Sequence, residues 1–249
     1  MNLPGPQIER VWGRRLAEAM ATAVGGGGLA WAMGWALGIA PYTAAVGALN
    51  GWVAGWRWMY EWRSGSGWLA FVLDSTWGLL GVTGGLVLNG VNALVYRKAA
   101  GYRPDLTYRT NHQAYAAGFS LKRGYAFTLG NAISGAAGSI DLDLEGSRND
   151  RRRQFIRRHE ALHVWQNRWF GPVYQIVYAG WLLGGTIAAV LVWAFRRKEF
   201  GRVLETLAYF DNPFEYWAYR NDENWPPRDA HAAFVWGPGR SSTTPPRIE

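Results

Sequence analysis

Three long runs without a charged residue restrict the fold of this chain more than any other feature. Residues 21–40, 76–96 and 173–195 contain no Asp, Glu, Lys or Arg, and each run is at least twenty residues long. An α-helix of about 20 apolar residues reaches across the hydrocarbon core of a bilayer. The runs therefore predict a mainly α membrane protein in which smaller polar parts lie between the helices.

Glycine indicates how the first helices pack. The chain has 32 glycines and 16 tryptophans, a combination typical of membrane helices, in which small residues permit close approach and Trp lies at the interface. Pro41 separates the first run from a second uncharged stretch at 42–56. We expect two tightly packed helices that meet near Pro41, the alternatives being one long kinked helix or a glycine-rich segment without a fixed partner. The glycines that recur on one helix face are Gly34 and Gly38, and then Gly47, Gly51 and Gly55.

Shorter signals flank these helices. Residues 1–20 carry three arginines between apolar side chains, which predicts an amphipathic helix on the membrane surface or, alternatively, a signal peptide. The Ser-Gly-Ser-Gly sequence at 64–67 predicts a loop. Asp74 and Ser75 predict the start of the next helix.

Two polar features show where the runs should meet protein and headgroups. Asn89 and Asn92 lie inside an uncharged run and should face protein, because an unpaired amide in hydrocarbon is costly. An interface signature precedes that run, since aromatic residues surround Arg57 and Arg63. The aromatic residues are Trp52, Trp56, Trp58, Tyr60 and Trp62.

One short stretch carries recognisable chemistry. His159-Glu160-Ala161-Leu162-His163 has the H-E-x-x-H spacing of zinc peptidases. On an α-helix the two histidines lie on one face, so both imidazoles can reach one metal ion. The Glu160 carboxylate would then stand beside the open coordination position, where it can take a proton from water. The motif predicts His159 and His163 as zinc ligands and Glu160 as the general base.

The flanking sequence predicts a helix over residues 150–170. Asn149 and Asp150 suit its N-cap, and the Gly-Pro pair at 171–172 is a stop signal. An inward stripe at helical spacing contains both histidines, and Gln166 in this stripe is a candidate to support the site. The alternative is an ordinary helix with two core histidines and a surface glutamate. The stripe consists of Phe155, Ile156, His159, Leu162, His163, Gln166 and Trp169.

Residues 99–148 differ from the apolar runs, because they are polar, punctuated by glycine and alternate in short pieces. We predict a small sheet beside the motif helix, as in zincin folds, which makes this part a small α+β zincin-like domain. Its edge strand is expected at Ser139–Leu144. The predicted strands are 106–109, 114–121, 125–129 and 139–144.

The third run, 173–195, has a Gly-Gly pair at 184–185 and ends at three cations, 196–198. Each half is too short to span a bilayer. We therefore predict a re-entrant apolar hairpin of two short helices, broken at the glycines, that returns the chain to the side it left. The proline-rich chain after residue 225 predicts an extended tail that is ordered only where it packs.

A catalytic zinc site needs a third protein ligand, and the chain has no cysteine. Glu215 is the candidate because it starts a helix behind Asn212 and Pro213. The same spacing is also a capping box, in which the Glu215 carboxylate would bond the backbone N–H of Asn212. Tyr219 and His231 are candidate hydrogen-bond donors near the reaction centre. The rival ligands are Glu205, Asp211, Asp141, Asp143 and His112.

Three sequence blocks resemble a largely uncharacterised bacterial family of zincin-like, membrane-associated zinc metallopeptidases with the gluzincin-type HExxH motif. The resemblance covers roughly residues 75–220 and leaves the first two apolar segments outside it. The blocks are Thr128–Ile133, His159–Gln166 with Arg168–Pro172, and Asp211–Tyr219.

This resemblance implies roles for the motif residues but no substrate. It implies the two motif histidines as metal ligands, Glu160 as the base and Glu215 as the third ligand. The chain departs from the family at Asn131, where His is common, and at Trp217, where Glu is common. Both departures remove a polar group expected near the site.

The sequence is compatible with two functions. The first is a membrane-embedded zinc metallopeptidase that hydrolyses peptide bonds; the second is a non-catalytic accessory or scaffold subunit of a membrane complex. The expected partners are the lipid bilayer, a membrane protein or a second copy of the chain, and a peptide substrate if the protein is active. The net charge of +8 fits a basic surface on anionic lipid, and because no nucleic-acid motif accompanies it, nucleic acid is not expected.

Charge and composition also predict the organisation of the chain. Thirteen of the 26 Lys and Arg residues lie in 97–172, which by the positive-inside tendency makes the zincin-like domain cytoplasmic at a bacterial inner membrane. Four segments are expected. They are the N-terminal helices 1–67, a transmembrane helix 68–98, the zincin-like domain 99–225 interrupted by 173–195, and the tail 226–249.

Overall fold

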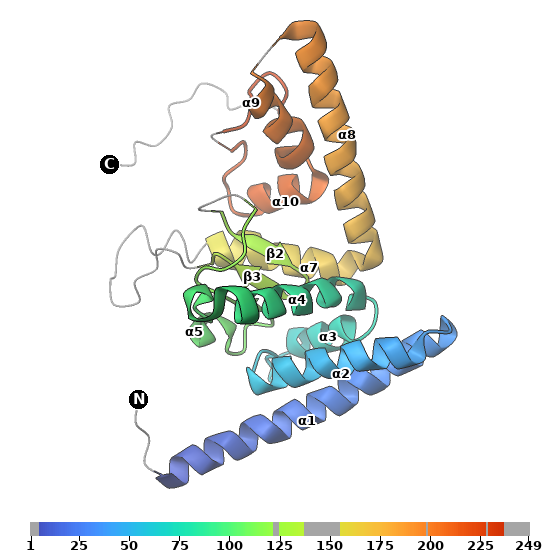
Figure 1. The fold of residues 1–249 in the computed structure, drawn as a ribbon, viewed down its shortest axis with the longest axis vertical. Helices are drawn as coiled ribbons and strands as arrows, with labels where there is room; N and C mark the ends of the chain where they lie inside the picture. Colours follow the sequence, from blue (N-terminus) through green and yellow to red (C-terminus); the bar gives the residue numbers. More distant parts are fainter. Residues whose placement is uncertain (1–4, 122–124, 137–154, 198, 228, 237–249) are drawn as a thin grey trace. The chain divides into compact units, whose positions relative to one another are not determined.

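The computed structural model describes residues 5–121, 125–136, 155–197, 199–227 and 229–236. Within them the chain is mostly helical and has one small three-stranded sheet, which confirms the predicted mainly helical fold with a small sheet (Figure 1). The chain forms two compact units, Met1–Tyr174 and Gln175–Glu249, and each is described by itself. The four segments expected from the sequence stay a prediction.

The first unit begins with two long helices, α1 (Gly5–Ala36) and α2 (Ala40–Trp56), which form a hairpin (Figure 1). The turn between them contains Gly38 in the left-handed region, with φ of 72°. Two helices that meet near Pro41 are thus confirmed. The separate helix expected at 1–20 is wrong, because α1 continues through residue 20 without a break.

Glycine is what lets α1 and α2 approach. A methyl group at Gly51 would lie 2.1 Å from the carbonyl oxygen of Thr22, and one at Gly47 would lie 2.5 Å from that of Gly26. Such distances are possible only without a Cβ atom. The predicted small-residue packing is therefore confirmed at these positions.

The next helix, α3 (Gly65–Asp74), begins where a loop was predicted. The Ser64 hydroxyl accepts a hydrogen bond from the Gly67 N–H at 3.1 Å, so the serine acts as an N-cap. Asp74 ends this helix and is fully buried, where a helix start was expected. The predicted loop at 64–67 and the predicted helix start at Asp74 are both wrong. Ser64 caps α3, and Asp74 belongs to a buried ion pair.

Helix α4 (Leu79–Val91) continues into a π-helical turn, η1 (Asn92–Tyr96), and a 3₁₀ turn, η2 (Arg97–Ala100). Asn89 Oδ1 accepts from the Tyr115 hydroxyl at 2.6 Å, and Asn92 Nδ2 donates to the Ser134 hydroxyl at 2.8 Å. The prediction that these two amides face protein is confirmed.

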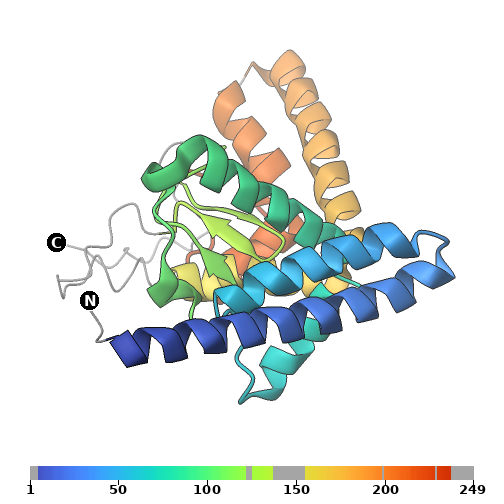
Figure 2. The same ribbon diagram turned by 60° about the horizontal axis from the view of Figure 1, so that its bottom comes forward.

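The sheet lies against α4 and has the order β1-β3-β2 (Figure 2). β1 runs parallel to β3, with Gln113 opposite Ala132, and β2 runs antiparallel to β3, with Thr128 opposite Ile133. The strands are β1 (Gln113–Ala114), β2 (Phe127–Leu129) and β3 (Ala132–Ser134).

The structure confirms some of the predicted strands and not others. The strand at 125–129 is confirmed by β2, while only the first residue of 114–121 belongs to a strand. The strand at 106–109 is wrong, because Pro104 starts a short helix, α5 (Pro104–Thr107). The expected edge strand at 139–144 lies outside the described residues.

The motif helix consists of a π-helical turn, η3 (Ile156–Glu160), followed by α7 (Ala161–Phe170). Ile156 and Val164 pack in a core with Ala114 and Ile133 of the sheet, which fixes the face that turns inward. Trp169 is exposed and so lies off this face, unlike the predicted stripe. Gly171, with φ of 52°, ends the helix as predicted, and the expected N-cap lies outside the described residues.

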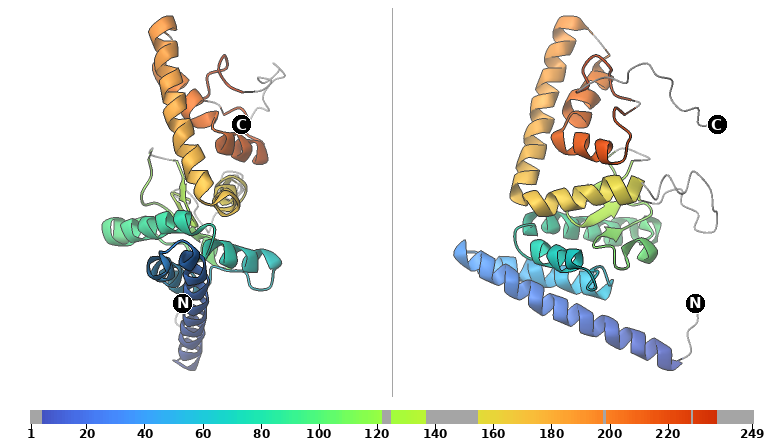
Figure 3. Two further views of the ribbon diagram at one scale, coloured as in Figure 1. Left: turned by 90° about the vertical axis from the view of Figure 1, so that its right-hand side faces the viewer. Right: turned by 180° about the vertical axis from the view of Figure 1, so that it is seen from behind.

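The second unit is built on α8 (Pro172–Arg196), a single continuous helix of 25 residues (Figure 3). The re-entrant hairpin predicted at 173–195 is therefore wrong. The chain returns beside α8 instead. The returning elements are α9 (Phe200–Leu204), a π-helical turn η4 (Glu205–Phe210) and α10 (Pro213–Asn221).

Contacts along α8 explain why its glycines do not break it. The Trp193 ring lies 5.9 Å from that of Phe200, and Trp181 Nε1 donates to the Leu207 carbonyl at 3.0 Å. A methyl group at Gly185 would lie 2.3 Å from the Leu207 carbonyl oxygen. The glycine thus permits a close approach of the returning chain, and it does so inside an intact helix.

Two helical segments in the described parts of the chain are long and apolar enough to cross a membrane. They are Leu79–Ala100 and Pro172–Arg196. The first apolar run, 21–40, does not qualify as such a span, and its glycines pack on α2 instead. The tail has no helix or strand over 225–227 and 229–236, where turns connect its residues.

Candidate metal centre

The two motif histidines lie side by side and are buried. Their ring centroids are 4.9 Å apart, with the rings nearly perpendicular. The His159 ring also stacks on Phe155, at a centroid distance of 4.7 Å. The i, i+4 spacing of His159 in η3 and His163 in α7 therefore places both imidazoles on one face, as predicted from the motif.

Gln166 contacts the second histidine. Its Oε1 lies 2.8 Å from His163 Nδ1. With the amide oxygen as acceptor, the proton lies on Nδ1 and the lone pair on Nε2, the nitrogen that can bind a metal. The contact with Gln166 orients the His163 ring.

Glu160 is buried as well, so the alternative of a surface glutamate is wrong. Its Oε2 accepts a hydrogen bond from the Thr128 hydroxyl at 2.6 Å. Thr128 belongs to β2, and the sheet therefore orients the carboxylate. A short hydrogen bond from a hydroxyl holds the Glu160 side chain in one rotamer.

In the second unit Glu215 is buried in the first turn of α10. The capping-box alternative is wrong, because the Asn212 N–H donates to the Tyr209 carbonyl at 3.0 Å. The Asn212 side chain does cap the helix, accepting from the Phe214 N–H at 3.0 Å. Glu215 Oε1 accepts from the Tyr178 hydroxyl of α8 at 2.7 Å.

These residues form a group suited to a metal ion. His159, His163 and Glu215 are buried, and each offers one ligand atom that a metal ion could bind. Two imidazole nitrogens and one carboxylate oxygen are the donor set of catalytic zinc sites, which keep a fourth position open. The donors fit zinc, while its actual binding stays a prediction.

Comparison of the chain with protein-family models, curated proteins and solved structures finds no match. The resemblance to zincin-like peptidases therefore remains a prediction carried by the motif residues.

None of the rival ligands that the structure describes belongs to this group. His112 is buried, and burial together with the nearby charge of Arg168 lowers its pKa to about 4, which keeps it neutral. Burial raises the pKa of Asp211 to about 6. Glu205 lies in η4, and the rivals Asp141 and Asp143 are outside the described residues.

The two other supporting candidates have structural contacts of their own. Tyr219 packs in an apolar cluster with Phe210 and Ala230. His231 donates its backbone N–H to the Thr206 hydroxyl at 2.7 Å, and its Nδ1 accepts from the Ala233 N–H at 3.3 Å. Their part in the chemistry stays a prediction.

The departures from the family pattern have different surroundings. Asn131 is buried and donates to Asn50 Oδ1 at 2.9 Å and to Asp74 Oδ2 at 3.3 Å, so it belongs to a polar network of the first unit. Trp217 is exposed on α10. The contacts of Asn131 are thus structural.

Two residues that orient the candidate groups were not predicted from the sequence. Thr128 lies in a block that carries the resemblance, and the alternation of β2 could have directed attention to it. Tyr178 offered another signal, since it is a hydroxyl within a run that has no charge and few polar groups.

Proposed function

We propose that this protein is a zinc-dependent hydrolase of peptide bonds that works at a membrane. The observation that carries the proposal is the pair of buried imidazoles of His159 and His163, whose ring centroids lie 4.9 Å apart. Glu215 is the proposed third ligand. The contacts of Gln166 with His163 and of Thr128 with Glu160 support it, because active sites need oriented side chains.

The chain's own residues would share the reaction as follows. A zinc ion held by this group would supply Lewis-acid polarisation of the scissile carbonyl and lower the pKa of the attacking water. Glu160 would accept the proton of that water and deliver it to the leaving amine. Thr128 would hold the carboxylate towards the water, and Gln166 would keep the Nε2 lone pair of His163 available.

The test is peptide hydrolysis by the purified full chain, with a fluorescent casein digest as probe and with Glu160→Gln as variant. The amide keeps the size of the side chain but cannot accept the proton. We expect turnover to fall by at least about 100-fold while the zinc content is unchanged. Equal turnover in both proteins would contradict the role of Glu160, and loss of zinc with activity would make it a structural residue.

A second function is favoured by the exposed side of α1. Met20, Val24, Trp31 and Trp35 are all exposed there, although the other side of α1 packs on α2. Apolar surface of this extent marks a contact with lipid or with another protein. An accessory subunit would carry such a surface. Zinc binding without hydrolysis, together with a stable complex recovered after cross-linking, would favour this function.

We keep the predicted location as part of the proposal. It is the bacterial inner membrane, with the motif helix on the cytoplasmic side. Protease treatment of inverted and right-side-out vesicles measures the side directly. Cleavage after residue 100 only in inverted vesicles is expected, whereas cleavage only in right-side-out vesicles would reverse the orientation.

A further inference from the structure

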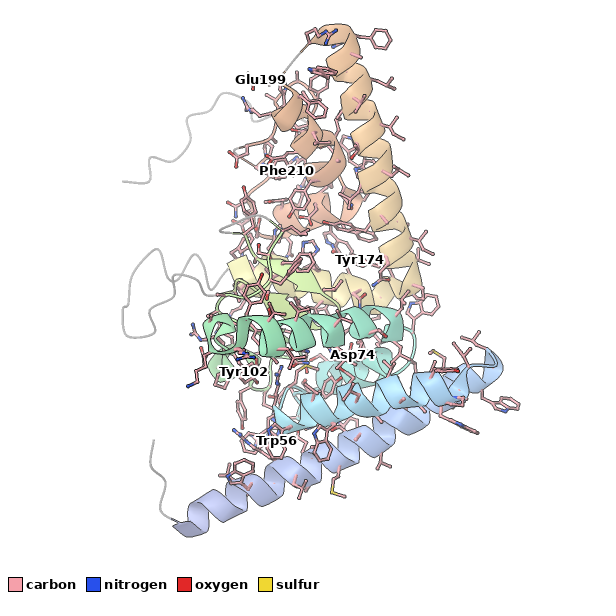
Figure 4. The ribbon with its side chains drawn as sticks, viewed as in Figure 1. Trp56, Asp74, Tyr102, Tyr174, Glu199 and Phe210 are labelled. Carbon is pink, nitrogen blue, oxygen red and sulfur yellow. The ribbon has the colours of Figure 1, made fainter. Side chains whose placement is uncertain are left out.

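One side of α8 is apolar and exposed along its whole length in the second unit. Ile176 is 70% exposed, Leu183 65% and Ile187 53%, and Phe195 near the end is 84% exposed. No charged residue lies between Pro172 and Phe195. Figure 4 shows side chains that project from α8 on the side away from the returning segment. Water is an unfavourable environment for a continuous apolar surface of this kind.

The opposite side of α8 is covered by the returning segment. Tyr178 contacts Glu215, Trp181 contacts Leu207, and Trp193 contacts Phe200. These contacts extend over most of the helix. Helix α8 therefore packs against the returning segment on one side and exposes apolar side chains on the other.

The tail packs on the returning segment, and its irregular backbone does not suit hydrocarbon. The His231 N–H bonds Thr206, and the Trp236 N–H bonds Asp211 Oδ1 at 3.1 Å. The tail has neither helix nor strand there and exposes Asp229. Irregular backbone of this kind does not occur against lipid tails, because its polar groups cannot all be paired.

These contacts exclude a simple crossing of α8. Leu207 lies beside the middle of α8, and the neighbouring Thr206 holds the tail. If α8 spanned the bilayer, the tail would lie at mid-depth in hydrocarbon.

We propose that α8 lies in the plane of the membrane surface, with its exposed side in the acyl-chain boundary of the bilayer. The returning segment and the tail then face water. Arg196, Arg197 and Lys198 follow the apolar side directly and fit anionic headgroups, and the Arg197 guanidinium lies 4.8 Å from the Trp193 ring centre. The occupant of the exposed side is lipid, and this proposal is independent of zinc.

The absence of cysteine permits a direct test. The full chain with Ile176→Cys, Leu183→Cys or Leu191→Cys is labelled with the fluorophore NBD and reconstituted into phosphatidylcholine–phosphatidylglycerol vesicles. Nitroxide lipids spin-labelled at acyl carbon 5 or 12 quench the label according to its depth. Arg202→Cys is the control for a position in water. Circular dichroism checks the fold, and Val190→Cys replaces any variant that misfolds.

The in-plane arrangement predicts the same quenching ratio at all three positions, with carbon 5 more effective than carbon 12, and little quenching at Arg202→Cys. A crossing helix would place the outer labels about 10 Å from the central one, at 1.5 Å per residue. Strongest quenching by carbon 12 at Leu183→Cys alone would overturn the orientation. The absence of quenching at all three positions would overturn lipid as the occupant.

Discussion

At the residue scale, the most deeply buried charges belong to an ion pair that joins α3 to the motif helix. Arg168 Nε and Asp74 Oδ1 are 2.8 Å apart, and both side chains are almost completely inaccessible to water. The Tyr60 hydroxyl and Asn131 also bond Asp74. This network positions α7, and hence the two motif histidines, relative to α3 within the first unit.

Neutralising one partner of this pair should destabilise the fold strongly. We expect Asp74→Asn to lower the free energy of unfolding by about 3–5 kcal/mol, because Arg168 would keep an uncompensated buried charge. Asp105→Asn is the matched control, since the Asp105–Arg103 pair is partly exposed and should contribute less than about 1 kcal/mol. Chemical denaturation of both variants measures the difference, and equal losses would contradict the assignment.

A second residue-scale prediction concerns Asp211, whose pKa burial raises from 3.8 to about 6. Between these values the folded protein holds a proton that the unfolded chain has released. Stability therefore falls as the pH rises through 6. Asp211→Asn removes this dependence, so its melting temperature relative to the wild type should be higher at pH 7.5 than at pH 4.5. The amide adds only a pH-independent offset, and an unchanged difference between the two pH values would refute the prediction.

At the element scale, helices were predictable from hydrophobic runs, but their ends and directions were not. The runs located α2, α4 and α8 because apolar length and glycine spacing are local properties. The short strands could be placed only at β2, since two- and three-residue strands depend on α4 and the motif helix beside them. The helix break predicted at 184–185 is wrong. A glycine pair in a sequence can break a helix or let another segment pack closely against it, and the sequence does not distinguish the two.

This distinction gives a matched pair of variants in α8. A methyl group at Gly185 would meet the Leu207 carbonyl, whereas nothing lies within 4 Å of one at Gly184. We expect Gly185→Ala to cost about 1–3 kcal/mol through overpacking. Gly184→Ala should stabilise the helix by about 0.5–1 kcal/mol. Thermal unfolding measures both, and a destabilising Gly184→Ala would indicate a helix broken at this pair.

At the scale of the whole molecule, the HExxH motif predicted the positions of its own side chains, but it did not predict which residues contact them. The paired histidines follow from helix periodicity alone, and Glu215 was found through its position at a helix start. Thr128 and Tyr178 could not be assigned, because their contacts depend on a strand and on a returning helix far apart in sequence. The hairpin predicted at 173–195 was wrong, because the chain returns as separate elements beside an unbroken α8, where the Tyr178 hydroxyl contacts Glu215.

The central claim is that His159, His163 and Glu215 hold one zinc ion. Zinc bound per chain, measured by mass spectrometry on the purified full chain after dialysis, tests it directly. We predict about one zinc ion for the wild type and for the control His231→Ala, and strongly reduced zinc for His163→Ala and Glu215→Ala. A wild type without zinc, or equal zinc in all four proteins, would contradict the account.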